Sequence, residues 1–139
     1  MAGINGRRVL LGGLLAGLIS NILGVSFAHL VLWGEVQAIV ERFHLPPFPA
    51  YTPFAHLTTR FLWGVALVWL YAAIRPRYGP GPRTAVRAAV AAWFFLYFVF
   101  ALGMAPWGFF PVRVLAIMAV WGLGELLLMA LAGAWVYRE

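Results

Sequence analysis

Four long apolar runs dominate the chain, and short polar or proline-rich segments separate them. The runs cover about residues 9–33, 54–75, 85–104 and 112–137. Each is about as long as an α-helix must be to cross ~30 Å of hydrocarbon, because a helix rises ~1.5 Å per residue. The pattern therefore predicts an all-α fold, a four-transmembrane-helix bundle that forms one membrane domain over residues 1–139.

The segment after the first run has a different pattern. Apolar residues recur at helical spacing from Val36 to Phe43, while Glu35, Glu41 and Arg42 take the other face. This pattern indicates a short amphipathic interfacial helix, which lies on the membrane surface or extends the first span beyond it. Four prolines within residues 45–53 then favour an extended loop.

Three residues mark the expected ends of the middle spans. Thr52, followed by Pro53, is typical of a helix N-cap and first turn. We expect Pro76 to end the second span and Thr84 to cap the third.

Composition agrees with a bilayer environment and excludes several kinds of chemistry. Hydrophobic residues make up 64% of the chain and charged residues 10%, against ~45–50% and ~25% in soluble domains. The chain has no cysteine, which excludes thiolate metal sites and cysteine nucleophiles. We find no catalytic constellation and predict no enzyme.

The positive charge indicates topology. The net charge of +6 comes from arginines in short segments between apolar runs, so we expect membrane lipids and no nucleic acid as partners. The arginines at one side of the four spans are Arg7, Arg8, Arg75, Arg77, Arg83, Arg87 and Arg138. The positive-inside rule then places both termini in the cytoplasm, with the protein in a bacterial inner membrane.

Two segments carry a resemblance. They are residues 69–85 (WLYAAIRPRYGPGPRTA) and the stretch from Trp121-Gly-Leu-Gly-Glu125 to Trp135-Val-Tyr-Arg-Glu139. They resemble a family of small uncharacterised bacterial four-span integral membrane proteins. The resemblance implies the four-span fold and no activity.

Glu125 is the main candidate for a functional site. It lies in the middle of the fourth span, next to Gly124 and three residues after Gly122. An ionisable residue at this depth is costly and is expected to face protein or a water-filled cavity. Either it is a protonatable or cation-contacting carboxylate, or it joins helices through Asn21 or Ser20.

Arg60 is the candidate partner of Glu125. A direct pair needs helix tilt or a bridging water, because side chains lean toward the helix N-terminus and Arg60 therefore leans away from Glu125. The alternative is that Arg60 extends to lipid headgroups. We expect Glu125 and Asn21 to form the floor of a ligand or proton site, with Arg60, His56 and His29 at its outer mouth.

The remaining polar candidates lie near the outer surface. His29 and His56 could hold a haem or, with Glu35 or His44, a metal ion, but no local metal motif is present, so we predict no metal and leave the cofactor open. We expect Arg113, at the start of the fourth span, to contact an interfacial anion or lipid phosphate.

Small residues indicate helix packing. Gly13, Gly17 and Gly24 recur on the first span, and Gly122 lies beside Glu125. Such spacing lets helix backbones approach closely, so we expect a homo-oligomer through this stripe or a larger membrane complex.

These observations lead to three hypotheses. The first is a membrane protein whose interior binds, senses or passes a small ligand, ion or proton at Glu125. The second is an accessory or assembly subunit, and the third is a haem- or quinone-binding redox protein.

Overall fold

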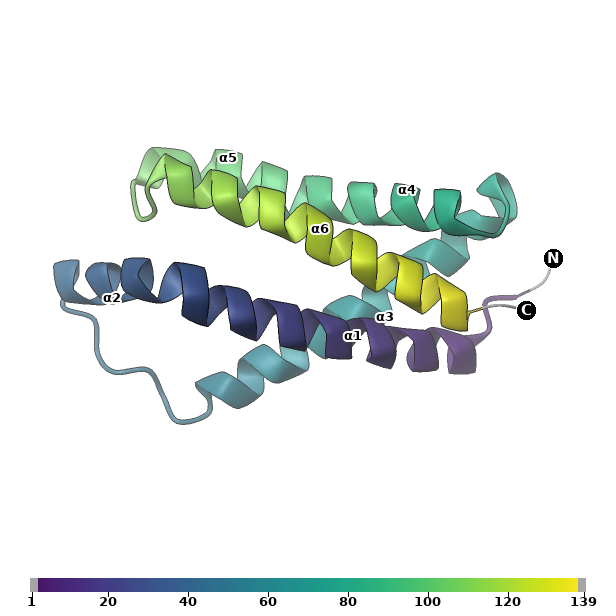
Figure 1. Cartoon of the computed structure of the whole chain (residues 1–139), viewed down its shortest axis with the longest axis horizontal. Helices are drawn as coiled ribbons and strands as arrows, with labels where there is room; N and C mark the ends of the chain where they lie inside the picture. The colour runs from purple at the N-terminus through teal and green to yellow at the C-terminus, as the bar shows by residue number, and fades with distance from the viewer. Residues whose placement is uncertain (1–2, 138–139) are drawn as a thin grey trace.

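Helices account for all the regular structure that the computed structural model describes, which covers residues 3–137 (Figure 1). Four helical rods are long and apolar enough to cross a membrane, which confirms the predicted four-span helical fold. The elements are α1 (Gly6–Phe27), a π turn (Ala28–Leu32), α2 (Trp33–Arg42), α3 (Thr52–Tyr78), α4 (Pro82–Trp93), a second π turn (Phe94–Val99), α5 (Phe100–Met104), a 3-10 turn (Ala105–Trp107) and α6 (Val112–Val136).

The amphipathic segment extends the first span. The π turn connects α1 to α2 without a break, and Gly6–Arg42 forms one helix of 37 residues. Figure 1 shows α2 in line with α1. The predicted amphipathic helix is therefore present as α2, and of its two predicted arrangements the extension of the first span describes the chain.

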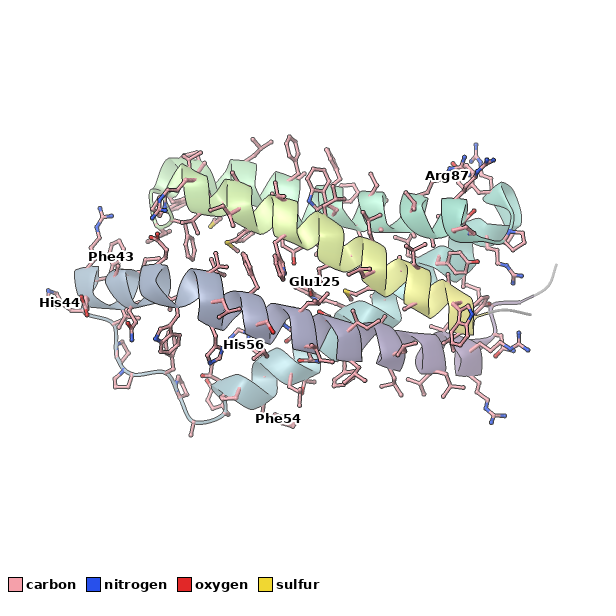
Figure 2. The ribbon with its side chains drawn as sticks, in the orientation of Figure 1. Phe43, His44, Phe54, His56, Arg87 and Glu125 are labelled. Carbon is pink, nitrogen blue, oxygen red and sulfur yellow. The ribbon has the colours of Figure 1, made fainter. Side chains whose placement is uncertain are left out.

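Two ends of the bundle can be distinguished. The start of α1, the end of α6 and the α3–α4 turn lie at one end, where Figure 2 labels Arg87, and we call it the basic end. The Asn5 amide donates to the Tyr137 hydroxyl over 3.1 Å, which joins the start of α1 to the end of α6. The opposite end holds α2, the loop to α3 and the α5–α6 turn, and Figure 2 labels His44 there.

Helices α1 and α3 cross at close contact. A Cβ on Gly13 would lie 2.5 Å from the Val65 Cα, and one on Gly17 would lie 2.7 Å from the Phe61 Cα. A Cβ on Gly64 would in turn overlap the backbone of α1. The glycine stripe of the first span is thus covered by α3 of the same chain, which confirms its predicted role in helix packing. A homo-oligomer or a larger complex stays a prediction.

The core lies in the half of the bundle nearer the basic end. It is built from small and aliphatic residues of α1, α3, α4 and α6, with Tyr71 and Tyr137 in edge-to-face contact at 5.9 Å between ring centroids. Ala16, Val68, Ala85, Ala88, Ala89 and Met129 have no exposed surface. Small side chains on α4 let it lie close to α6.

The predicted helix ends need three corrections. Thr52 is the first residue of α3 and Tyr51 is its N-cap. Pro76 lies inside α3, which ends at Tyr78, because a proline in the last turn removes only one helical donor. Thr84 lies inside α4, after the N-cap Gly81, and its hydroxyl donates to the Gly79 carbonyl over 2.7 Å.

Candidate functional site

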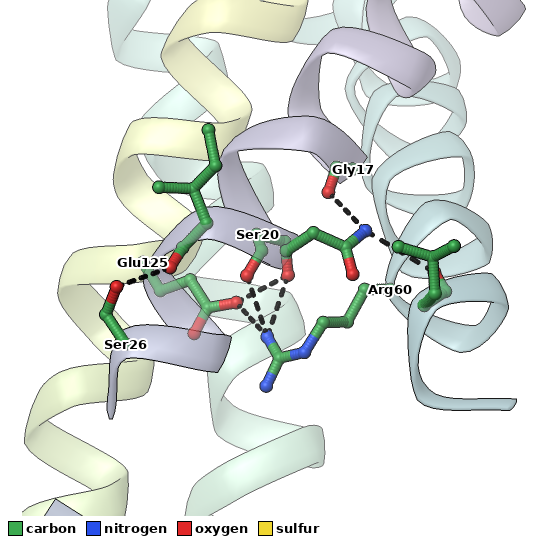
Figure 3. A network of polar contacts seen from close by, with 8 residues as sticks. Gly17, Ser20, Ser26, Arg60 and Glu125 are labelled. Atoms are coloured by element: carbon green, nitrogen blue, oxygen red, sulfur yellow. Dashed lines mark hydrogen bonds and ion pairs between the residues drawn. The ribbon is translucent and has the colours of Figure 1, made fainter. Parts of the chain in front are cut away.

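Glu125 is buried where three helices meet. It lies midway along the bundle on α6 (Figure 2) and is 3% exposed. Its Oε1 accepts a hydrogen bond of 2.5 Å from the Ser20 hydroxyl of α1 and one of 2.7 Å from Arg60 Nη1 of α3 (Figure 3). The carboxylate therefore connects α6 to both α1 and α3.

Arg60 forms the direct ion pair that the sequence left open. Its Nη1 also donates to the Ser20 backbone carbonyl and to the Ser20 hydroxyl, each over 3.0 Å. The guanidinium occupies the place where Gly24 lacks a side chain, because a Cβ on Gly24 would overlap it. Gly24 thus lets Arg60 lie flat against α1 and reach Glu125 without a bridging water.

Pairing lowers the free-energy cost of burying each charge at this depth. The Glu125 side chain is 2% exposed and the Arg60 side chain 22% exposed. A buried charge without a counter-charge is strongly destabilising, whereas two opposite charges in hydrogen-bond contact offset one another. The ion pair is therefore neutral overall, and Arg60 is its more exposed member.

A groove between α1 and α6 opens beside this unit. It has a volume of about 540 Å³. Its lining residues are Leu23, Ala116, Ile117, Val120, Trp121, Gly124, Glu125 and Leu128. Glu125 is the only charged residue among them, and Val120 and Leu128 are 76% and 52% exposed. The groove, which we call the α1–α6 groove, is thus apolar, opens on the outer surface of the bundle and is lined in part by Glu125.

One aromatic ring, that of Trp121, forms part of the groove wall, and it packs on a buried phenylalanine. The rings of Phe27 and Trp121 stack with centroids 4.8 Å apart and an interplanar angle of 15°. Trp121 lies one helical turn before Glu125 on α6. The stack fixes the position of this aromatic wall relative to the carboxylate.

The two glycines near Glu125 have different surroundings. A Cβ on Gly122 would overlap the ring of Tyr97, which belongs to the second π turn. A Cβ on Gly124 would meet nothing within 4 Å, because this glycine borders the groove. Gly122 therefore serves helix packing, as predicted, while Gly124 leaves space in the groove.

Asn21 makes its hydrogen bonds to backbone carbonyls and not to Glu125. Its Nδ2 donates to the Gly17 carbonyl over 2.9 Å and to the Leu57 carbonyl over 3.4 Å, so it bridges α1 and α3. Its Oδ1 is buried and accepts no hydrogen bond within residues 3–137. Asn21 thus joins α1 to α3, and its place with Glu125 in one ligand site stays a prediction.

The two candidate histidines lie on the surface. His56 is exposed on α3, and His29 is exposed in the first π turn, where its ring stacks on Trp33 at 6.0 Å. His29 Nδ1 lies 3.0 Å from the Val25 carbonyl. In the described part of the chain, no three histidine or carboxylate side chains come together as metal ligands.

Arg113 has a protein partner. It forms an ion pair with Glu35 of α2, and its side chain is 70% exposed. The anion that offsets this charge at the start of α6 is therefore a carboxylate of the same chain. A lipid phosphate as the main partner, which we expected, is not needed to explain Arg113.

Sequence reasoning left out two residues near the site. The predicted partner Ser20 is confirmed, because its hydroxyl donates to Glu125. Trp121 and Tyr97 were not singled out for the site. Trp121 lies four residues before Glu125, and Tyr97 lies inside the aromatic run of the third span. Both positions indicated helix packing and gave no sign of a groove beside Glu125.

Comparisons of the chain with protein-family models, with curated proteins and with solved structures found no match. The resemblance carried by residues 69–85 and by the segments from Trp121 onward stays a prediction.

Proposed function

We propose that this protein binds a small lipophilic ligand inside the bilayer, in the α1–α6 groove, with Glu125 as the polar contact. The proposal assigns binding to the chain and no catalytic step. The observation that carries it is an apolar groove of about 540 Å³ whose lining includes the buried Glu125 carboxylate.

The size and lining of the groove support ligand binding. Pockets for small molecules usually have volumes of ~300–1,000 Å³ and combine apolar walls with few polar groups that orient the ligand. Because the groove opens on a surface formed by exposed apolar residues such as Val120 and Leu128, a ligand dissolved in the bilayer can enter sideways.

The ion pair supports the binding role by holding the carboxylate in place. Ser20 and Arg60 both donate to Glu125 Oε1, so the carboxylate has a fixed orientation before any ligand arrives. A polar contact that is positioned in advance loses little conformational freedom when the ligand binds.

The location follows the charge pattern. We propose a bacterial inner membrane, with the basic end and both termini in the cytoplasm, because the arginines of the α3–α4 turn gather at that end. The groove then lies near the middle of the hydrocarbon.

The test fills the groove without disturbing the bundle. Gly124→Leu places a side chain in the open groove, and Gly103→Leu is the matched control, since a Cβ on Gly103 of α5 also meets nothing within 4 Å. The probe is a photoreactive trifluoromethyl-diazirine benzyl alcohol, added to protein in phosphatidylcholine nanodiscs. We expect saturable labelling of residues 116–128 that Gly124→Leu abolishes and Gly103→Leu preserves. Equal labelling of both variants contradicts the proposal.

A second candidate function is that of an assembly subunit whose polar residues only join helices. It is favoured by the fact that Glu125, Ser20 and Arg60 connect three helices. Glu125→Gln and Glu125→Leu separate the two functions. Loss of probe labelling in folded Glu125→Gln supports the ligand site. Unchanged labelling in Glu125→Gln, with loss of assembly in Glu125→Leu, supports the assembly role.

A redox protein is the third hypothesis, and an absorption spectrum tests its haem form directly. The two candidate histidines lie exposed on the surface, away from the groove. A Soret band in purified protein would contradict the proposed ligand site and favour haem binding.

A further inference from the structure

Only one of the two carboxylate oxygens of Glu125 is used within the described residues. Oε1 accepts hydrogen bonds from Ser20 and Arg60, and in Figure 3 no dashed line reaches the other oxygen of Glu125. Glu125 Oε2 accepts no hydrogen bond from the residues that the structure describes. Glu125 lines the α1–α6 groove, so its second oxygen is the acceptor that a ligand in the groove would meet.

A carboxylate oxygen can only accept hydrogen bonds, so its complement is a donor. A ligand carbonyl, ether or carboxylate offers no hydrogen to Glu125 Oε2 and leaves it unsatisfied. In a groove whose other lining residues are apolar, no lining side chain offers a competing charged group. The ligand group that meets Glu125 must therefore carry an O–H or N–H.

The net charge of the site selects between a neutral and a charged donor. Arg60 already lies 2.7 Å from Glu125, so the pair is neutral before the ligand binds. A cationic ligand would leave one uncompensated positive charge in the hydrocarbon and would lie near Arg60. Uncompensated charges at this depth are costly, whereas a neutral hydroxyl keeps the site neutral.

The rest of the groove determines the body of the ligand. Trp121, whose ring stacks on Phe27, provides the aromatic part of the wall, and apart from Glu125 the other lining residues are aliphatic or glycine. Such walls suit a ring or an alkyl chain, and the Trp121 indole N–H is the one further side-chain hydrogen-bond donor among the lining residues. Resting on the proposed function of the groove, we propose that its ligand is a neutral lipophilic alcohol or phenol whose hydroxyl donates to Glu125 Oε2.

The experiment compares probes that differ only at the donor. The diazirine benzyl alcohol is matched with its methyl ether, which has the same body but no O–H, and with the benzylammonium analogue, which carries a positive charge. Labelling of residues 116–128 is divided by labelling of residues 94–99, whose exposed aromatic side chains report how much probe enters the bilayer. We expect roughly tenfold more groove labelling by the alcohol than by the ether, since a hydrogen bond to a charged acceptor is strong. We expect this preference to shrink in Glu125→Gln.

Three results overturn parts of the proposal and can be told apart. Equal labelling by alcohol and ether, blocked in both cases by Gly124→Leu, overturns the hydroxyl donor while the groove remains a binding site. Stronger labelling by the ammonium probe overturns the neutral ligand. Labelling by all three probes that is indifferent to Gly124→Leu overturns the proposed function itself.

Discussion

The two halves of the bundle are built differently. Near the basic end, α1, α3, α4 and α6 converge on a core of alanines, aliphatic residues and two tyrosines. Toward the opposite end, α3 diverges from the other helices (Figure 1), and its residues Phe54 and Leu62 are 70% and 62% exposed. The ion pair and the α1–α6 groove lie between these regions.

This difference assigns stability to the closely packed half and leaves the groove for ligand binding. Interiors packed as closely as the α1–α3 contact tolerate no added atoms, so they favour one arrangement of the helices. The groove keeps open space next to this packed region, and the packed helices hold Glu125 in position beside it. The following predictions test whether the ion pair and the packed half carry the stability and the groove does not.

The largest effect is expected from breaking the ion pair. Arg60→Leu leaves Glu125 buried without a counter-charge, which should lower the free energy of unfolding by about 3–5 kcal/mol. The double variant Arg60→Leu with Glu125→Leu should recover most of this loss. Unfolding in detergent micelles measures both. Losses that simply add would show that the two residues do not depend on one another.

A smaller effect is expected from adding one methyl group to the helix contact. Gly64→Ala places a Cβ against the backbone of α1 at Gly13 and Gly17, so the two helices must separate. We expect a loss of about 1–3 kcal/mol in unfolding free energy. Gly124→Ala is the control, because its Cβ enters the open groove and should leave stability unchanged. Equal losses for the two variants would contradict the division between the halves.

The smallest effect is expected at the surface pair. Arg113 and Glu35 join α6 to α2, but Arg113 is 70% exposed, so water and salt screen the interaction. Arg113→Gln should cost about 0–1 kcal/mol, and the cost should vanish at high salt. Unfolding at low and high salt checks this. A cost comparable to that of Arg60→Leu would show that solvent exposure does not determine how much each ion pair contributes to the free energy of unfolding.

The fold was predictable because the hydrocarbon thickness constrains it strongly. Apolar runs of bilayer length gave the four spans, and the last one ends within one residue of the predicted boundary. The continuity of α1 and α2 was not predictable, because an amphipathic pattern is the same on a surface helix and on an extension. The local π turn that accommodates Ala28–Leu32 has no signal in the residue types.

The site was predictable in its residues more than in its geometry. Burial of Glu125 followed from the cost of a charge in lipid, but its contact with Arg60 depended on Gly24, which the sequence indicated only as a packing residue. The spacing of small residues indicates that another helix packs closely on the first span, but it does not identify that helix. It is for this reason that the sequence did not identify α3 as the helix that covers the glycine stripe.

The separation of Arg60 and Glu125 along the chain has a consequence for synthesis. The arginine leaves the ribosome 65 residues before its counter-charge, an interval of about 3–13 s at ~5–20 residues per second. During that time the second span carries a cation without Glu125, and its partner on the first span is Ser20. Completion of the last span is thus the moment at which the earlier insertion becomes electrically balanced.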